Sequence, residues 1–576
     1  MQLDTPVPYI KRLIQEGCAS EDIIRVSKWA SDDRSEDIKL GDLSPAELDS
    51  LEAMFVEDGL NTGVRKIQHF KKICVNPTGA TVSRLETLEI ALKEWLGGTP
   101  NKWLFCEQND GVMVPYFVED IRFEKASKRD QRPASVRVKM RATLRGGDAN
   151  DSLAFEHGDL KGRHTVEALM NKKGYYLETL DLVKDYEEQL ARVTEIRDKV
   201  GEQFAATGQS FAQGEYHRSM SEVVSMVRDG TAAKVVMDDP FDENSKRDAA
   251  PCRTGSRANA SYTLWAEWAK QKEKGKIGGS KPKKEELDLD DDEMSVVVPV
   301  HPYVKVYDLG KHRFCLIHVN NLKAWNYEVG LIDKLVLPDD IKDLVTILIE
   351  SADDLLEDIV RGKTGGIIVT STGEPGVGKT LTAEVFSEEM QRPLYVVQCS
   401  QLGTDETELE SRLDTVLARA TRWKAILLLD EADVYVHERG EDIHQNAIVG
   451  VFLRVLEHYR GVLFMTSNRD VIIDDAILSR STAHIRYAIP DTDAKLTEVW
   501  RILSTQFQTP IDAPLMAKLL QAFPPGVLSP RNIKNMLKLA RTLNRKRAHV
   551  IDLALFQRVA KFIDLAHPER MPLPPS

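Results

Sequence analysis

The chain is poor in cysteine, and its apolar runs are short. Six cysteines are spread over 576 residues without a CxxC pair, which argues against a disulfide framework and against a cysteine zinc site. Apolar runs such as Ile426–Leu429 have only strand length, so no membrane span is expected. The first residues lack a basic start followed by an apolar run, so we expect no signal peptide. These absences together predict a cytoplasmic location.

Basic residues are fewer than acidic ones, 77 against 90, and the formal net charge is −13. Proteins dedicated to nucleic acid are usually basic, so nucleic acid is not the expected partner. A chain of this length exceeds what one hydrophobic core supports, and we expect three or four domains.

The first half of the chain shows helix and strand patterns without a motif that specifies chemistry. Residues 1–98 are predicted to be helical, and residues 99–237 to form an α+β domain with a long helix. Apolar residues alternate with basic ones over 136–141, which predicts a half-buried strand whose basic face is solvated or, as the alternative, contacts phosphate. Residues 164–206 are predicted to be helical, including an amphipathic helix that packs on its own domain or meets a partner.

Two further segments separate this half from the rest. Residues 238–294 are rich in small and charged residues and are predicted to be a flexible charged linker. Residues 295–329 are predicted to form a β-hairpin that turns near Gly310 and leads into the next domain.

A phosphate-binding loop follows a short apolar strand. The strand is Gly365–Thr370, and a helix is expected to extend through Met390. Between them stand the residues of a Walker A motif, Gly373, Glu374, Pro375, Gly376, Val377, Gly378, Lys379 and Thr380. Glycines let backbone N–H groups point at phosphates, Lys379 should reach the β and γ phosphates, and Thr380 should bind Mg²⁺. The pattern therefore predicts ATP and Mg²⁺ as ligands.

Polar residues end two later strands. The apolar run from Ala425 ends in Asp430 and Glu431, and the strand from Gly461 ends at Asn468. Carboxylates at the C-terminal edge of a parallel sheet lie where ligands bind in such folds. We expect Asp430 to hold the Mg²⁺, Glu431 to act as general base, and Asn468 to orient the attacking water. Without the other motifs, a turn residue at a strand end would be the better interpretation of Asn468.

Residues 330–566 resemble the AAA branch of the AAA+ ATPases. The resemblance rests on the motifs above and on Thr466–Arg480, which looks like the second region of homology of that branch. Residues 421–433 and 451–459 are particularly similar to AAA proteins abundant in fungi, which pair one ATPase domain with an uncharacterised N-terminal region. The implied fold is an α/β P-loop module with a parallel sheet flanked by helices over 330–490. A helical lid over 491–576 would follow it, and an α+β N-terminal region would precede it. Within the lid segment, Ser529 is the predicted cap of a helix that begins at Pro530. The buried face of that helix is predicted to hold Ile533, Met536, Leu537 and Ala540.

The resemblance also implies an assembly. It predicts a homo-oligomer, commonly a hexameric ring, in which Asn468 is the sensor-1 residue and Arg480 is an arginine finger for the neighbouring subunit. Related proteins often carry a second arginine close by, but here the segment reads Leu478-Ser-Arg480-Ser-Thr, so a second arginine finger is not expected. The nearby Arg486 is interpreted as structural. Arg531, at the start of a predicted lid helix, matches the sensor-2 position or is a surface arginine.

Three functions are compatible with these patterns. The first is an ATP-driven remodeller of a protein or assembly whose N-terminal half selects a substrate or adaptor. The second is a nucleic-acid-linked ATPase, and the third is a nucleotide-gated scaffold with slow turnover. The loop after the second strand offers Leu402 and Gly403 without an aromatic residue, and acids follow it. We therefore expect that the protein does not thread polypeptides, although Leu402 could simply pack the loop on the sheet.

Overall fold

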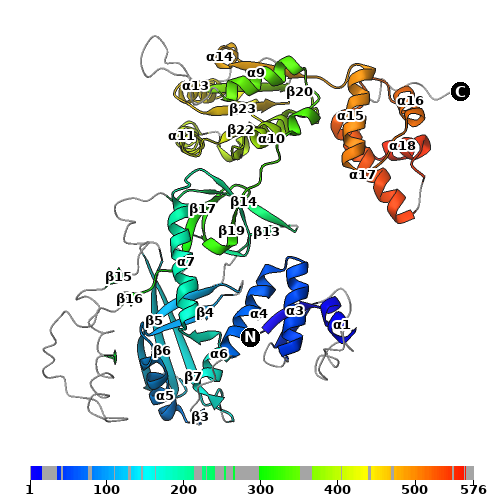
Figure 1. Cartoon of the computed structure of the whole chain (residues 1–576). Coiled ribbons are helices and arrows are strands. Elements are labelled where there is room, and N and C mark those ends of the chain that lie inside the picture. The colour runs from blue at the N-terminus through cyan, green and yellow to red at the C-terminus, as the bar shows by residue number, and fades with distance from the viewer. Residues whose placement is uncertain are drawn as a thin grey trace. The chain divides into compact units, whose positions relative to one another are not determined.

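The computed structural model forms two compact units, residues 1–200 with 204–323, and residues 201–203 with 324–576 (Figure 1). The structure describes residues 2–15, 35–39, 43, 45–74, 81–82, 84–108, 111–126, 132–144, 147–162, 164–212, 224–228, 230–239, 252–253, 264–265, 297–350, 366–403, 405–438, 443–468, 473–547, 550–563 and 565. Within these residues no helix is long and apolar enough to cross a membrane.

Two strands lie among the first helices. The elements are β1 (Gln2–Pro6), α1 (Val7–Gln15), β2 (Ser35–Lys39), α3 (Pro45–Glu57), α4 (Asn61–Cys74), β3 (Thr81–Val82) and α5 (Leu85–Gly97). β1 and β2 pair antiparallel across a long stretch of chain. The helical prediction for 1–98 missed this pair, because a short strand with a distant partner leaves little local periodicity to detect.

An antiparallel sheet of five strands, in the order β7-β6-β5-β4-β9, forms the main core of the first unit. Its strands are β4 (Trp103–Glu107), β5 (Met113–Glu124), β6 (Ser135–Leu144), β7 (Gly147–Glu156) and β9 (Tyr175–Leu177). The alternation predicted over 136–141 is confirmed, since Val136, Val138 and Met140 are buried on one face of β6.

The basic face of β6 is paired with acids of β5. Arg137 lies 3.3 Å from Glu124, and Arg141 lies 3.6 Å from Glu119. Carboxylates beside both arginines offset the positive charge that a phosphate would need. The pairing favours the solvated interpretation of this face over phosphate contact.

The helical segment predicted over 164–206 is divided. It contains β8 (His164–Thr165), α6 (Val166–Lys172), strand β9, α7 (Leu180–Arg197) and β10 (Gln203–Ala206). Gly174 and Gly201 adopt positive φ angles of 82° and 90°, a conformation that interrupts helices. Thr179 caps α7 by accepting a hydrogen bond from the Leu182 N–H at 3.2 Å. Phe204, inside the segment predicted to be helical, lies instead in strand β10.

The second sheet of this unit follows the order β12-β11-β18-β17-β14-β10-β19, with β13 paired to β14. Its other strands are β11 (Gln209–Ala212), β12 (Val224–Ser225), β13 (Val227–Arg228), β14 (Thr231–Met237), β17 (Tyr303–Asp308), β18 (Arg313–His318) and β19 (Leu322–Ala324). The hairpin predicted near Gly310 is confirmed as β17–β18, with Asp308 accepting from the Gly310 N–H at 3.0 Å. The hairpin belongs to a sheet of the first unit, whereas the prediction treated it as a separate segment that leads into the next domain.

Most of the predicted linker over 238–294 lies outside the described residues. Within it, β15 (Cys252–Arg253) pairs with β16 (Val297–Val298). The Trp265 side chain is buried, and its indole N–H donates to the Val118 carbonyl at 2.7 Å. These short described pieces of the segment are attached to the first unit.

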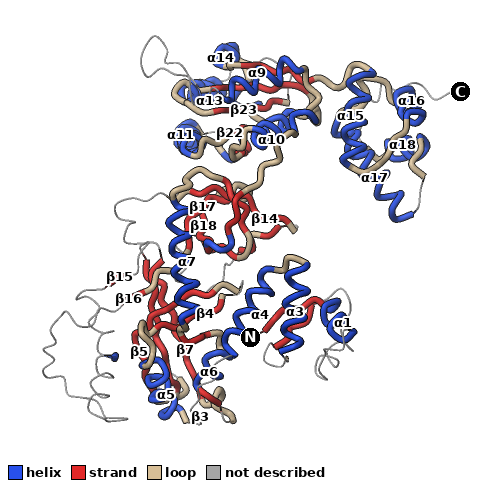
Figure 2. Tube along the Cα trace, viewed as in Figure 1, coloured by secondary structure: helices blue, strands red, loops and turns tan. Residues whose placement is uncertain are grey.

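The second unit contains a parallel sheet in the order β21-β22-β23-β20-β24. Its elements are α9 (Asp339–Glu350), β20 (Ile367–Gly373), α10 (Lys379–Glu389), β21 (Leu394–Gln398), α11 (Glu406–Arg422), β22 (Ile426–Asp430), α12 (Asp433–Val436), α13 (Ile443–Leu456), β23 (Val462–Ser467), α14 (Asp475–Arg480) and β24 (Ala483–Tyr487). Helices flank these strands (Figure 2), which confirms the predicted α/β fold class. Because all strands are parallel, the ends of β20, β22 and β23 share one edge.

Four helices form a separate core after the sheet. They are α15 (Asp493–Gln506), α16 (Ala513–Ala522), α17 (Pro530–Arg547) and α18 (Leu553–Ala560). The cap predicted for α17 is confirmed, since the Asn532 N–H donates to Ser529 Oγ at 3.2 Å with Pro530 at the first helical position. The residues predicted to face the core of α17 are buried: Ile533, Met536, Leu537 and Ala540.

Candidate nucleotide site

The glycines of the phosphate loop are required by its backbone. Gly373 ends β20 with φ 140°, and a Cβ there would lie 2.2 Å from the Tyr487 carbonyl oxygen. Gly378 has φ 112° and is the N-cap of α10, so the loop enters the helix through a conformation that L side chains rarely adopt. The N-terminal N–H groups of α10 are thereby placed beside the loop, where they favour an anion.

Lys379 is buried at the start of α10. It is 6% exposed, and its Nζ donates to the carbonyl oxygens of Gly373 at 2.6 Å and Glu374 at 2.8 Å. A buried ammonium bound by carbonyls of its own loop holds a positive charge next to the helix N-terminus. The arrangement suits an anionic ligand that would take over those contacts.

Three oxygen atoms meet where β22 and β23 end. Asp430 Oδ1 accepts hydrogen bonds from Thr380 Oγ1 at 3.1 Å and from Thr466 Oγ1 at 2.6 Å. A hydroxyl and a carboxylate oxygen side by side are the hard ligands that Mg²⁺ prefers. Among the described residues, no group of three His, Cys, Asp or Glu side chains could hold a metal. The Thr380 hydroxyl and the Asp430 carboxylate fit two ligand positions of a magnesium ion, whose other ligands would be water and phosphate oxygens.

Glu431 adopts an uncommon backbone conformation. Its φ is 58°, in the left-handed region that non-glycine residues rarely occupy, and its side chain is exposed. The Glu431 N–H donates to Thr466 Oγ1 at 3.1 Å, and the Ala432 N–H donates to the Thr466 carbonyl at 2.8 Å. Thr466 thus connects Asp430 to Glu431. Sequence reasoning missed it, because nothing in the pattern marks a threonine inside an apolar strand.

Asp433 holds the end of β23. Its Oδ1 accepts from Ser467 Oγ at 2.5 Å and from the Asn468 N–H at 3.0 Å. Asn468 therefore stands at a fixed place next to the acidic pair. Sequence reasoning also missed Asp433, although its position three residues after Asp430 was a usable signal.

The carboxylates make this edge of the sheet electronegative. Burial, followed by the charges of Asp430, Asp433 and Glu431, raises the pKa of the Cys399 thiol to about 12. Cys399 is therefore an unreactive thiol. A divalent cation would relieve the same concentration of negative charge.

The two predicted arginines lie in different surroundings. The Arg531 N–H donates to the Gly376 carbonyl at 3.2 Å, and a Cβ built on Gly376 would be 2.7 Å from Arg531 Cβ. Arg531 thus lies against the phosphate loop. Arg480 is exposed at the end of α14, where Nη1 donates to the Ala476 carbonyl and Nη2 is 3.7 Å from Glu457. Its contacts are with α14 and Glu457, not with the phosphate loop.

The loop after β21 packs inward. Leu402 is 2% exposed, and the Tyr435 hydroxyl contacts the carbonyl oxygens of Cys399 at 2.9 Å and Gly403 at 2.6 Å. Arg412 donates to the Gln401 carbonyl at 2.9 Å. The structure thus favours a packing role for Leu402 over an exposed gripping role.

Residues 369–489 match the family described as "ATPase family associated with various cellular activities (AAA)". The chain carries an AAA ATPase domain. The matched residues begin inside β20 and end just after β24, and they include the phosphate loop and the acidic pair. A domain of this family implies nucleotide binding that typically depends on Mg²⁺, in agreement with the oxygen ligands described above.

The relatives of this AAA domain have diverse names. A 26S proteasome regulatory subunit homolog of Methanothermobacter thermautotrophicus is 24% identical over 201 residues, covering 32% of this chain and 53% of the relative. The ATP-dependent zinc metalloprotease FtsH 1 of Petrotoga mobilis is 26% identical over 247 residues, covering 40% and 36%. The crystal structure of the FIGL-1 AAA domain in complex with ADP has 17% identity and a TM-score of 0.33, covering 42% of this chain and 86% of that one. The chain spans about half or less of the length of these curated relatives.

Proposed function

We propose that this protein hydrolyses ATP and uses the energy to remodel a protein or macromolecular assembly. The observation that carries the proposal is the convergence of Lys379, Thr380, Asp430 and Glu431 at one edge of the sheet. Thr380 bonds to Asp430, and Thr466 links Asp430 to the Glu431 backbone. This set combines a phosphate site, a cation site and a carboxylate. It is the minimum that hydrolysis of a nucleoside triphosphate requires.

Each residue has a proposed task. The loop residues Gly373–Thr380 bind the phosphates through backbone N–H groups, and Lys379 leaves its two carbonyls to contact the β and γ phosphates. Thr380 and Asp430 hold Mg²⁺, which offsets phosphate charge when bound. Glu431 takes the proton of the attacking water.

The neighbouring polar groups would assist. The fixed place of Asn468, given by Asp433, supports a role in orienting the water. Contact of Arg531 with Gly376 supports the sensor-2 assignment, in which the lid responds to the phosphates. The core over 330–490 and the lid over 491–576 are the proposed domains that these residues couple.

The active form is proposed to be a homo-oligomeric ring, a hexamer. Arg480 is exposed at a helix end, so its guanidinium is accessible to a neighbouring subunit's phosphates. A site completed in this way would hydrolyse ATP only in the assembled ring. The first unit would select the protein substrate or adaptor.

Two observations bear on how the substrate is handled. Leu402 is buried, which supports our hypothesis that the protein rearranges folded partners without threading them. The acid-paired face of β6 gives no support to the nucleic-acid alternative. Names among the relatives, such as proteasome regulatory subunit homolog, are compatible with work on proteins.

The test has two parts. Lys379→Ala should abolish binding of a fluorescent ATP analogue, because the buried counter-charge of the phosphates is lost. Unchanged affinity would remove the loop from the site. A Glu431→Gln trap, incubated with ATP and recovered with its partners, then asks what is remodelled. Recovery of nucleic acid in place of protein would contradict the remodelling role.

A further inference from the structure

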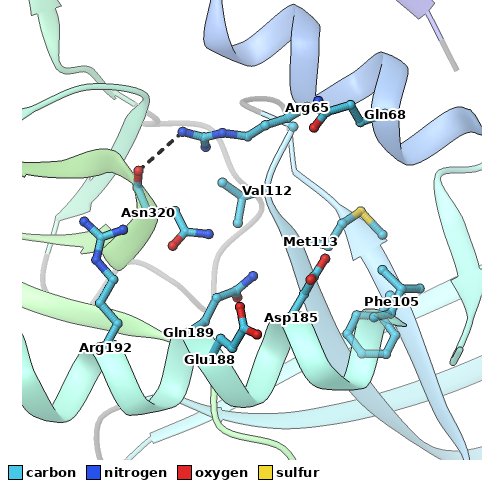
Figure 3. Close-up of a pocket in the computed structure, with 12 residues that line it drawn as sticks. Arg65, Gln68, Phe105, Val112, Met113, Asp185, Glu188, Gln189, Arg192 and Asn320 are labelled. Carbon is cyan, nitrogen blue, oxygen red and sulfur yellow. Dashed lines mark hydrogen bonds between the residues drawn. The ribbon is translucent and has the colours of Figure 1, made fainter. Parts of the chain in front are cut away.

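The first unit contains a cavity of about 400 Å³ that no sequence motif marks (Figure 3). Sites for small ligands typically measure roughly 300–1,000 Å³. The lining comes from α4, the β4–β5 region, α7 and the short helix η3 (Val319–Asn321). The cavity is therefore large enough for a small ligand, and four separate parts of the chain line it.

One side of the cavity is positive. Arg65, on α4, donates to Asn321 Oδ1 at 3.2 Å and to the Asn320 carbonyl at 3.3 Å. Arg192, on α7, donates to the Leu322 carbonyl at 2.6 Å. Both guanidinium groups are thus held against residues 320–322, on either side of the Asn320 side chain (Figure 3).

A buried histidine next to them stays neutral. Burial, followed by the charges of Arg65, His301 and Arg192, lowers the pKa of His318 well below its usual value. His318 Nδ1 accepts the Asn320 N–H at 3.1 Å, so the ring packs behind the arginine side. The positive charge of this wall therefore resides on the two arginines.

The face of α7 that lines the cavity carries two carboxylates and one side-chain amide. Asp185, Glu188 and Gln189 precede Arg192 at helical spacing and point toward the cavity (Figure 3). Gln189 Oε1 is buried and accepts no hydrogen bond from the described residues. A buried acceptor without a donor is unfavourable, and an N–H group of a ligand would satisfy it.

Apolar side chains form another part of the lining, next to the polar Gln68. Phe105, Val112 and Leu182 are buried, and Met113 is half-buried. An apolar side chain would lose water on binding there. With two arginines and two carboxylates, the lining has no net charge and a separation of opposite charges.

We propose that the cavity binds a short peptide segment of a partner protein that carries one acidic and one basic group around an apolar residue. The acidic group faces Arg65 and Arg192, and the basic group faces Asp185 and Glu188. A peptide also brings N–H groups for Gln189 and carbonyls for the Asn320 amide. A nucleic-acid backbone fits poorly, because carboxylates repel phosphate. The inference rests on the proposed function only in taking this segment as part of the remodelled substrate.

Peptide pools test the charge pattern directly. Capped pentapeptides with one Lys and one Glu fixed, in both orders, and Ala, Val, Leu or Met elsewhere are passed over the immobilised full-length protein without ATP. Matched pools replace Lys, Glu or both by Gln. We expect the doubly charged pools to be retained about tenfold more than the uncharged pool, the effect of one charge-assisted hydrogen bond. Equal retention of all pools, or of none, overturns the proposal.

Variants then assign each charge. Glu188→Gln should remove the preference for Lys and leave the preference for Glu, whereas Arg192→Gln should do the converse. Arg192→Lys, with its charge kept, should retain part of the preference for Glu, which separates charge from folding. Glu187→Gln and Lys184→Gln are the controls, because both residues are exposed on α7 and outside the lining. A loss of preference in the controls equal to that in Glu188→Gln contradicts the site.

Phosphate release by the same protein keeps the two proposals apart. Selective peptide retention by a protein that releases no phosphate would remove the ATPase proposal and leave the cavity proposal standing. Phosphate release without selective retention would do the reverse.

Discussion

The residues of the two proposed binding sites are distributed differently along the chain. In the second unit the nucleotide site uses a loop of consecutive residues, Gly373–Thr380, and groups that follow strands of one parallel sheet. In the first unit the cavity takes residues from Arg65 to Asn320, spread over four elements. A phosphate loop works through consecutive backbone N–H groups, so its sequence is a local motif. A cavity lined by distant side chains needs no motif, and the lack of one in the first unit says nothing against binding.

The largest effect is expected from replacing Arg480. This change tests whether the second unit hydrolyses ATP only in an assembly. Arg480→Ala should lower the rate of ATP hydrolysis by about 10³–10⁵-fold, the usual worth of an arginine finger. Mixed with inactive Lys379→Ala protein, it should recover activity, since some interfaces then pair an intact loop with an intact arginine. Steady-state phosphate release across mixing ratios is the measurement.

Arg486→Ala is the matched control for Arg480. Arg486 is also exposed, on β24, and was interpreted as structural, so most activity should remain. If subunits exchange and no mixing ratio recovers activity, Arg480 does not act on the neighbouring subunit.

Glu431→Gln is expected to keep ATP binding and to lose turnover by about 10²–10⁴-fold, since an amide cannot take the proton of the water. Nucleotide affinity and phosphate release are measured on the same preparation. Asp414→Asn, at an exposed acid of α11, is the control and should change neither. Near-normal phosphate release by Glu431→Gln would exclude Glu431 as the base.

Thr466→Val is expected to lower kcat by roughly tenfold to a hundredfold. It removes the hydrogen bond to Asp430 and the acceptor of the Glu431 N–H, a loss of about 1–3 kcal/mol. Thr466→Ser keeps the hydroxyl and should retain most activity. Measuring kcat against Mg²⁺ concentration tests the link to Asp430, and equal rates for the valine and serine variants would reject it.

The first unit should be the more acid-sensitive of the two. Burial lowers the pKa of His301 to about 3, so between about pH 3 and 6.5 the unfolded chain binds a proton that the folded one does not. Stability from this residue is complete above pH 6.5 and falls with pH, by about 2 kcal/mol at pH 5. Denaturant unfolding of wild type and His301→Gln at pH 7.5 and pH 5 measures it. Equal pH dependence of the two proteins would contradict the assignment.

Much of the second unit could be predicted from the sequence. The caps of α11 and α17 at Asp405 and Ser529, and the buried faces behind them, lie within one or two turns of chain. By contrast, β1 and β2 went unpredicted, and the helix expected over 164–206 is broken at Gly174 and Gly201. Periodicity reports neighbours along the chain, and these features depend on partners that lie far away in it.

The phosphate loop, the acidic pair at Asp430 and Glu431, and the AAA fold that carries them could all be inferred from the sequence. Each depends on residue types at fixed local spacing. The roles of Thr466 and Asp433, the burial of Leu402 and the cavity of the first unit became visible in the folded chain. The contacts of Thr466 with Asp430 exist because β22 and β23 lie side by side in parallel register, with Leu429 opposite Met465. Register is a property of packed strands, and no stretch of sequence specifies it alone.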